Sequence, residues 1–122
     1  MGARGESVIH ANGREIYLLF TTRACMSAEK QLGKSMPSIM RDFSLNNLSY
    51  TELAALLRAG MEAARMDAHT SGRPVSNNDA IDLIDEMGYT TVSAPIMEAV
   101  AAVMIYKPSD EGEVVEDGTD PN

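Results

Sequence analysis

Hydrophobic residues dominate two short stretches at the start of the chain, on either side of Asn12-Gly13. Asn-Gly is the dipeptide that best tolerates the positive φ angles of a two-residue hairpin turn. The pattern therefore predicts a β-hairpin with strands at residues 7–11 and 14–20.

The predicted second strand is apolar on both of its faces. One face carries Ile16, Leu18 and Phe20, and the other carries Tyr17 and Leu19. A lone hairpin is marginally stable in water, and at least one apolar face must be covered. We therefore expect the helices that follow, or a second copy of the chain, to pack over the hairpin.

After the hairpin, the apolar period changes to that of an α-helix. Capping residues, prolines and glycines divide this region into predicted helices. These helices span residues 22–32, 35–43, 49–69, 76–87 and 93–106. Thr22 is the expected cap of the first helix, and Ser93 is that of the fifth, with Pro95 in its first turn. Residues 70–75 combine turn formers with a proline and should form an exposed connection.

The third predicted helix has the clearest start and the clearest stripe. Ser49 and Glu52 match a capping box, in which the two residues reciprocally bond free backbone N–H groups. The apolar stripe consists of Leu53, Leu57, Met61, Ala64 and Ala68. The opposite face includes Ala55, together with Arg58 and Glu62 at the spacing of an ion pair.

The fourth predicted helix gathers three carboxylates on one side. The acids are Asp82, Asp85 and Glu86, and the residues predicted to face inward are Ile81, Ile84 and Met87. Hard-cation sites usually converge from a loop or from several elements, whereas these acids lie on one helix. A solvated face is therefore the better interpretation than a metal site.

The fifth predicted helix is apolar almost all round, with Glu98 as its one charge. A helix of this length rises roughly 20 Å, too little to cross a bilayer core. It is therefore either central in the domain or docked against another chain. From its composition, we assign the partner-binding surface to Ile96, Met97, Val100 and Met104.

Length and composition indicate one domain with a modest core. The chain has 122 residues, of which 44% are hydrophobic. We expect a single domain at residues 1–106, of class α+β but mostly α, followed by a disordered acidic tail at residues 107–122. Nine methionines are many for this length, and most of them are best interpreted as flexible core residues.

Charge and cysteine content restrict the partners and the compartment. The formal net charge of −8 argues against binding to nucleic acid, which requires Lys and Arg to neutralise phosphates. Cys25 is the only cysteine, so no intramolecular disulfide can form. The sequence shows no signal peptide and no membrane-spanning run. We therefore expect a cytoplasmic protein that does not insert into membranes.

Candidate chemistry is sparse. His10 and His69 are far apart in sequence, and neither has metal-ligand spacing to Cys25, which falls on the predicted apolar face of the first helix. The sequence contains no Gly-rich phosphate loop, paired-cysteine motif or nucleophile elbow. We therefore expect no catalytic site, no metal and no cofactor.

The order of these features resembles that of the tail assembly chaperones of long-tailed bacteriophages, particularly the type found in gene transfer agents. The resemblance spans about residues 6 to 106. The matching features are a hairpin around Asn12-Gly13-Arg14-Glu15-Ile16-Tyr17, Glu29 before Leu32-Gly33, the segment Ser35-Met36-Pro37-Ser38-Ile39, and later helices around Leu53-Ala54-Ala55-Leu56-Leu57 and Ala80-Ile81-Asp82-Leu83-Ile84. This chain departs from the pattern in being richer in methionine and acidic residues.

The resemblance implies a role that is not enzymatic. A tail assembly chaperone coats the long helical tape measure protein, keeps it soluble, helps to bring tail tube subunits to it, and is shed from the finished tail. By this resemblance the partners are the tape measure protein and the tail tube protein, in the cytoplasm of the bacterial host. A homo-oligomer is also compatible with the sequence.

Two other classes stay open from the sequence. A tail tube subunit, a label also given to members of this family, would be mainly β, because tubes are built from extended sheets. A small helical regulator could use the third and fourth helices as a DNA-binding pair. Its recognition helix would then carry Asp82 and Asp85, which repel phosphates.

Overall fold

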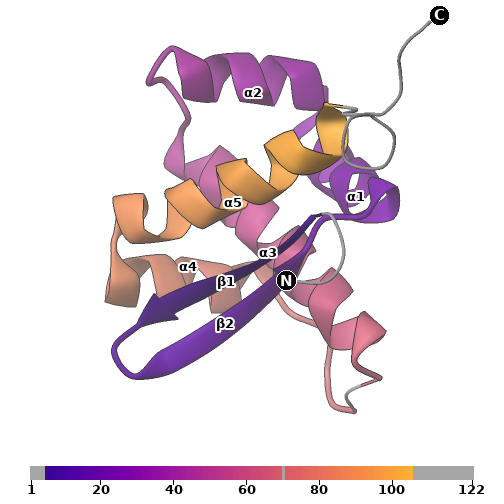
Figure 1. Ribbon diagram of the computed structural model, residues 1–122, viewed down its shortest axis with the longest axis vertical. Coiled ribbons are helices and arrows are strands. Elements are labelled where there is room, and N and C mark those ends of the chain that lie inside the picture. Colours follow the sequence, from indigo (N-terminus) through magenta and orange to yellow (C-terminus); the bar gives the residue numbers. More distant parts are fainter. Residues whose placement is uncertain (1–4, 70, 106–122) are drawn as a thin grey trace, which may run out of the picture.

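The hairpin predicted around Asn12-Gly13 is present in the computed structural model, which describes residues 5–69 and 71–105 (Figure 1). Strand β1 (Glu6–Ala11) pairs antiparallel with β2 (Arg14–Leu19). The two turn residues have φ angles of 54° and 73°, which Asn and Gly tolerate. The sequence signal for this turn is therefore confirmed.

Five helices follow the hairpin, so the fold is α+β and mostly α, as predicted. They are α1 (Thr22–Leu32), α2 (Met36–Ser44), α3 (Tyr50–Asp67), α4 (Asn77–Met87) and α5 (Tyr89–Met104). The tail predicted for residues 107–122 lies outside the described residues.

Side-chain caps set the start of four helices. α2, α3 and α4 each begin after a serine whose hydroxyl accepts a hydrogen bond from a backbone N–H of the first turn. The capping box of Ser49 with Glu52 is confirmed. α1 is capped by Thr21 rather than by Thr22, which is its first helical residue. Gly33, with a φ of 66°, ends α1 as predicted.

α5 begins earlier than predicted, at Tyr89 instead of after Ser93. Gly88 alone separates α4 from α5, with φ 92° and ψ 154°, a conformation that glycine adopts without the strain of a Cβ. Because no longer loop is needed, Ser93 is buried within the helix and does not cap it. Pro95 likewise lies inside the helix and not in its first turn.

α3 is the central helix and is buried more widely than its predicted stripe. It packs against β2, α1, α4 and α5. Ala55, predicted on the polar face, has no exposed surface, so that prediction is wrong. The predicted pair of Arg58 with Glu62 is also not formed, since Glu62 pairs with Arg65 and Arg58 bonds α1. All residues from 53 to 57 are buried, so this part of α3 needs apolar residues on every side, and an amphipathic stripe is too narrow a description of it.

α4 faces the core with a slightly different side than predicted. Ala80, Leu83, Ile84 and Met87 are buried, whereas Ile81 is 40% exposed. The prediction for Ile81 is therefore wrong. The buried residues recur at i, i+3, i+4 and i+7 from Ala80, and Ile81 lies beside that face.

The hairpin meets α3 at a contact that requires glycine. Phe20 has no exposed surface, and a Cβ added to Gly60 would lie 2.6 Å from an atom of the Phe20 ring. No real Cβ contact is that short, so a side chain at Gly60 would displace the ring. The hairpin is held against the central helix by this close approach.

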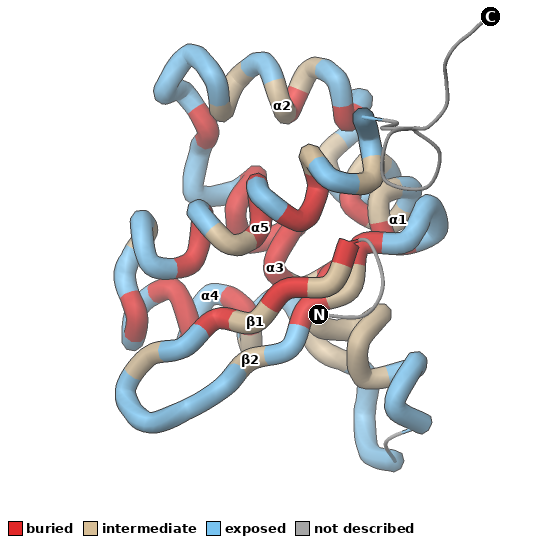
Figure 2. Tube along the Cα trace, in the orientation of Figure 1, coloured by how far each residue is buried: buried red, intermediate tan, exposed pale blue. Residues whose placement is uncertain are grey.

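The core runs along α3 between the hairpin and α5, and the exposed residues lie outside it (Figure 2). Ile9 and Leu18 cover the inner face of the hairpin with almost no exposure. Over residues 5–69 and 71–105, no helix combines the length and the hydropathy needed to cross a membrane.

Candidate functional site

The four residues assigned from sequence to a partner surface do not lie together on the outside of α5. Ile96 and Val100 have no exposed surface and Met97 is 4% exposed, so all three belong to the core of this chain. Met104 is 40% exposed near the end of the helix. One face of α5 packs inside the domain against β1, α3 and α4, as in the first of the two alternatives for that helix, while Ala94 and Glu98 on the other face are exposed. In this conformation, only Met104 of the four is available to a partner.

An open groove of about 570 Å³ lies elsewhere, between α1 and α3 and beside the end of β2. Its apolar lining consists of Leu19, Ala24, Ala59, Ala63 and Met66, with Ser27 among them. Met66 is 60% exposed, and Leu19 and Ala63 are half-buried. A cavity of this size can take a small molecule or several side chains of a protein partner.

Small side chains create this groove. Ala24 and Ser27 on α1 face Ala59 and Ala63 on α3, and such residues leave the space that larger side chains would fill. Arg58 of α3 fixes the two helices to each other, because its guanidinium donates to Ser27 Oγ at 2.7 Å and to an oxygen of α1 at 2.9 Å. The groove is thus part of the packed framework.

The rim of the groove is charged but largely self-paired. Glu62 forms an ion pair with Arg65 at 2.6 Å and accepts a hydrogen bond from the backbone N–H of Val75 at 2.8 Å. The guanidinium of Arg65, and to a smaller extent this N–H, lower the pKa of Glu62 to about 2, against the opposing effect of burial. Arg23 and Asp67 add one charge of each sign. The rim therefore has no strong net charge to attract a small ionic ligand.

A second cavity of about 410 Å³ lies beside α4 and is polar. Its two arginines are already paired: Arg14 with Glu86 at 2.7 Å and Arg73 with Asp79 at 2.9 Å. The Arg73 guanidinium, together with the capping box, holds the pKa of the Asp79 carboxyl well below its usual range. Since both arginines are paired, neither is free to bind a phosphate, and the other carboxylate in the lining is that of Asp82.

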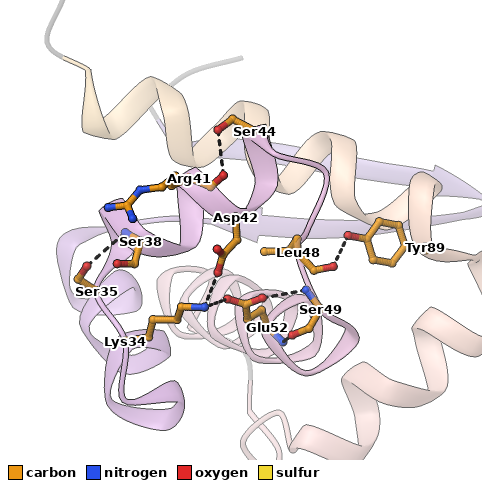
Figure 3. Close-up of polar contacts among 10 residues, drawn as sticks. All are labelled: Lys34, Ser35, Ser38, Arg41, Asp42, Ser44, Leu48, Ser49, Glu52 and Tyr89. Atoms are coloured by element: carbon orange, nitrogen blue, oxygen red, sulfur yellow. Dashed lines mark hydrogen bonds and ion pairs between the residues drawn. The ribbon is translucent and has the colours of Figure 1, made fainter.

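Lys34 anchors α2 to α3 through two carboxylates, Asp42 of α2 and Glu52 of α3 (Figure 3). The distance from Lys34 Nζ to Glu52 Oε2 is 2.7 Å, and the Glu52 side chain is 8% exposed. Burial by itself would raise the pKa of Glu52, but Lys34 and the backbone N–H of Ser49 lower it to about 2. The Glu52 carboxylate is thereby used twice, in the helix cap and in the anchor. This cluster is a structural joint between α2 and α3.

The remaining groups that could carry chemistry are separate from one another. Cys25 is half-buried on α1, and burial raises the pKa of its thiol, followed in effect by the nearby Glu29 carboxylate. His10 is exposed on the hairpin near Glu15, and His69 is exposed after α3. Among the described residues, no three His, Cys, Asp or Glu side chains come together as a metal site would require.

The sequence contained only a faint signal for the groove. Ala24 and Ala28 on α1, and Ala59 and Ala63 on α3, repeat small residues at the spacing of one helical turn. That spacing marks close helix packing without showing whether the resulting surface is covered. Comparisons of the chain with protein-family models, with curated proteins and with solved structures found no match.

Proposed function

We propose that this protein is a tail assembly chaperone of a long-tailed phage or gene transfer agent, which binds helical segments of the tape measure protein and is not an enzyme. The observation that carries this proposal is the open apolar groove between α1 and α3. The order of hairpin and helices, from which the family resemblance was inferred, supports it as well.

The groove suits the apolar stripe of an amphipathic helix. Such a partner presents anchors at positions i, i+3 or i+4, and i+7, which insert into a groove on the binding protein. Ala63 leaves room for one anchor, and Met66 at the mouth can change its rotamer to fit different side chains. A long helical partner with varied sequence needs an adaptable surface of this kind.

The charge of the chain fits the same role. A net charge of −8 keeps a complex with an apolar partner dispersed in solution. In this proposal the protein acts in the cytoplasm of the bacterial host, helps to bring tail tube subunits to the tape measure protein, and is released from the finished tail. A dimer or larger homo-oligomer would multiply the grooves available to one long partner.

The two alternative classes receive less support. A tail tube subunit is expected to be mainly β, whereas the described chain has one two-stranded sheet and five helices. For a DNA-binding regulator, α4 would be the recognition helix, and it exposes Asp82, Asp85 and Glu86. These acids would repel phosphates.

Co-expression with a tape measure fragment tests the proposal. The wild-type chain should keep the fragment in the soluble fraction and copurify with it. Ala63→Gln should fill the groove, and Met66→Gln should remove its exposed apolar side chain, each weakening binding about 10-fold. Met26→Gln is the matched control, because Met26 is also 60% exposed but does not line the groove.

The outcome distinguishes binding in the groove from binding by any exposed apolar side chain. Loss of the fragment with the two groove variants, but not with the control, supports the proposal. If the folded wild-type chain binds no tape measure or tail tube fragment, the chaperone assignment is wrong. If the control weakens binding as much as the groove variants do, the groove is not the docking site.

A further inference from the structure

Helix α2 is attached to the domain differently from the other helices. In the described part of the chain, it alone of the five helices lacks extensive close packing of its backbone against another helix or strand. It lies at one end of the molecule, away from the hairpin (Figure 1). Of its residues, Met36 and Ile39 are buried. An element with few buried contacts can open while the rest of a protein stays folded.

The apolar face of α2 has the spacing of a helix that docks into a groove. Met36 and Ile39 are buried, and Met40 and Phe43 pack half-buried against the same core. These positions are i, i+3, i+4 and i+7, the spacing at which a bound helix presents its anchors. All four side chains are large, so they fill the space between the core and a helix whose backbone stays apart from it. α2 therefore sits on the domain much as a helical ligand would.

The start of α2 is held by polar ties. The backbone N–H of Met36 donates to Glu29 Oε2 at 2.8 Å. Lys34, just before the helix, pairs with Asp42 and Glu52, and its side chain is 38% exposed (Figure 3). Because the Lys34 side chain is partly in water, its release costs less than that of a fully buried ion pair.

The end of this segment is held in a similar way. The Tyr89 hydroxyl donates to the backbone oxygen of Leu48 at 2.7 Å, and Leu48 is 6% exposed. On either side of α2 the chain turns through a left-handed residue, Gly33 with φ 66° and Asn46 with φ 59°. Because α1 ends before residues 34–48 and α3 begins after them, this segment can leave the surface without moving either helix.

We propose that α2 is a displaceable helix. Residues 34–48 open as one unit while the rest of the domain stays folded, and the socket, the surface covered by Met36, Ile39, Met40 and Phe43, then takes another amphipathic helix with the same anchor spacing. This occupant follows from the structure, because a helix of that pattern fills the socket already. The inference does not depend on the chaperone assignment or on the groove between α1 and α3.

Native-state amide hydrogen exchange of the full chain tests the opening. Amides of α2 should exchange about 100-fold faster than the slowest amides of α3, and their rates should depend less on denaturant, because opening exposes less surface than unfolding. Gly60→Ala weakens the contact of the hairpin with α3, which stays formed when α2 opens. It should therefore speed exchange in α3 about 10-fold and leave exchange in α2 unchanged. Equal acceleration in both helices would mean that α2 opens only when the whole domain unfolds, and would overturn the proposal.

A synthetic peptide of residues 34–48 tests the socket. Ile39→Ala in the chain weakens the chain's own α2 but leaves the socket unchanged, so the open state should become about 30-fold more populated. The peptide, which retains Ile39, should then bind about 30-fold more tightly than it binds the wild type, because the open state costs less to reach. Titration followed by NMR measures the affinity. Arg41→Ala, at an exposed position of the same helix, is the control and should change binding little.

Lys34→Met provides a second variant if Ile39→Ala does not fold. It removes the tie to Glu52 from the chain while the peptide supplies its own lysine, so the peptide should bind about 10-fold more tightly than it binds the wild type. Undetectable binding, or equal binding by the wild type and both variants, would overturn the proposal. So would binding that shifts the NMR signals of Met66 in the groove and leaves those of Glu52 and Tyr89 unchanged, since the peptide would then occupy the groove.

Discussion

Helix α5 and the groove between α1 and α3 are both apolar, but they differ in what covers them. Ile96 and Val100 of α5 have no exposed surface, because β1, α3 and α4 pack around the helix. In the groove, Met66 is 60% exposed, and the walls are built from alanine and serine. One region is made of large side chains that are covered, and the other of small side chains that leave an open surface.

The difference has a simple energetic meaning. Burying apolar surface contributes about 25 cal/mol per Å², so the side chains of α5 stabilise the fold itself. The apolar surface of the groove stays in water after folding, and its burial can contribute free energy only when a partner arrives. Substitutions in α5 should therefore act on stability, and substitutions in the groove should act on binding.

The largest effect is expected from a charge placed in the covered region. Val100→Asp should reduce the free energy of unfolding by about 4 kcal/mol or more, because it removes an apolar contact and buries a carboxylate without a partner. Chemical denaturation followed by circular dichroism measures the loss. Ala94→Asp, at an exposed position of the same helix, is the control and should change stability by less than about 0.5 kcal/mol. An unaltered denaturation midpoint for Val100→Asp would show that α5 is not in the core.

A smaller loss is expected where the hairpin touches α3. Gly60→Ala improves helix propensity by up to about 1 kcal/mol, yet it should destabilise the protein by about 1–3 kcal/mol, because the new methyl group collides with the Phe20 ring. Phe20→Leu in the same background should recover part of that loss. If Gly60→Ala is stabilising, the close approach of hairpin and helix is incorrect.

The sequence predicted local features well and burial less well. Asn12-Gly13 and the pair Ser49 with Glu52 specify a turn and a cap through contacts within a few residues, so both could be identified from the chain alone. Whether Val100 or Met66 faces solvent depends on which other elements pack there, and an apolar side chain has the same sequence signal in either place. The start of α5 was predicted too late for a related reason, because Gly88 alone can separate two helices.

The anchor of α2 should give an intermediate effect that depends on pH. Lys34→Met leaves Asp42 and Glu52 side by side without a cation and should cost about 1–2 kcal/mol at neutral pH. The folded protein lowers the pKa of Glu52 from its ordinary 4.5 to about 2, so its contribution to stability is complete above pH 4.5 and is lost as the pH falls toward 2.

Denaturation midpoints between these pH values measure this contribution. In Lys34→Met, stability should fall less steeply on acidification than in the wild type, because protonation then relieves the repulsion between the Asp42 and Glu52 carboxylates. A decline as steep as that of the wild type would assign the acid sensitivity to Glu62 or Asp79, whose pKa values are also lowered, by Arg65 and Arg73 respectively. The variants Arg65→Met and Arg73→Met distinguish these carboxylates, since the first should flatten only the Glu62 contribution and the second only that of Asp79.

The smallest effect on stability is expected in the groove. Met66→Gln and Met26→Gln replace side chains that are each 60% exposed, and both residue types favour helices, so neither change should shift the free energy of unfolding by more than about 0.5 kcal/mol. The two variants should nevertheless differ in binding, because only Met66 lines the groove. A large loss of stability for Met66→Gln would mean that the groove is closed in solution and belongs with α5. Equal stability with unequal binding would instead separate the surface that holds this protein together from the surface that holds its partner.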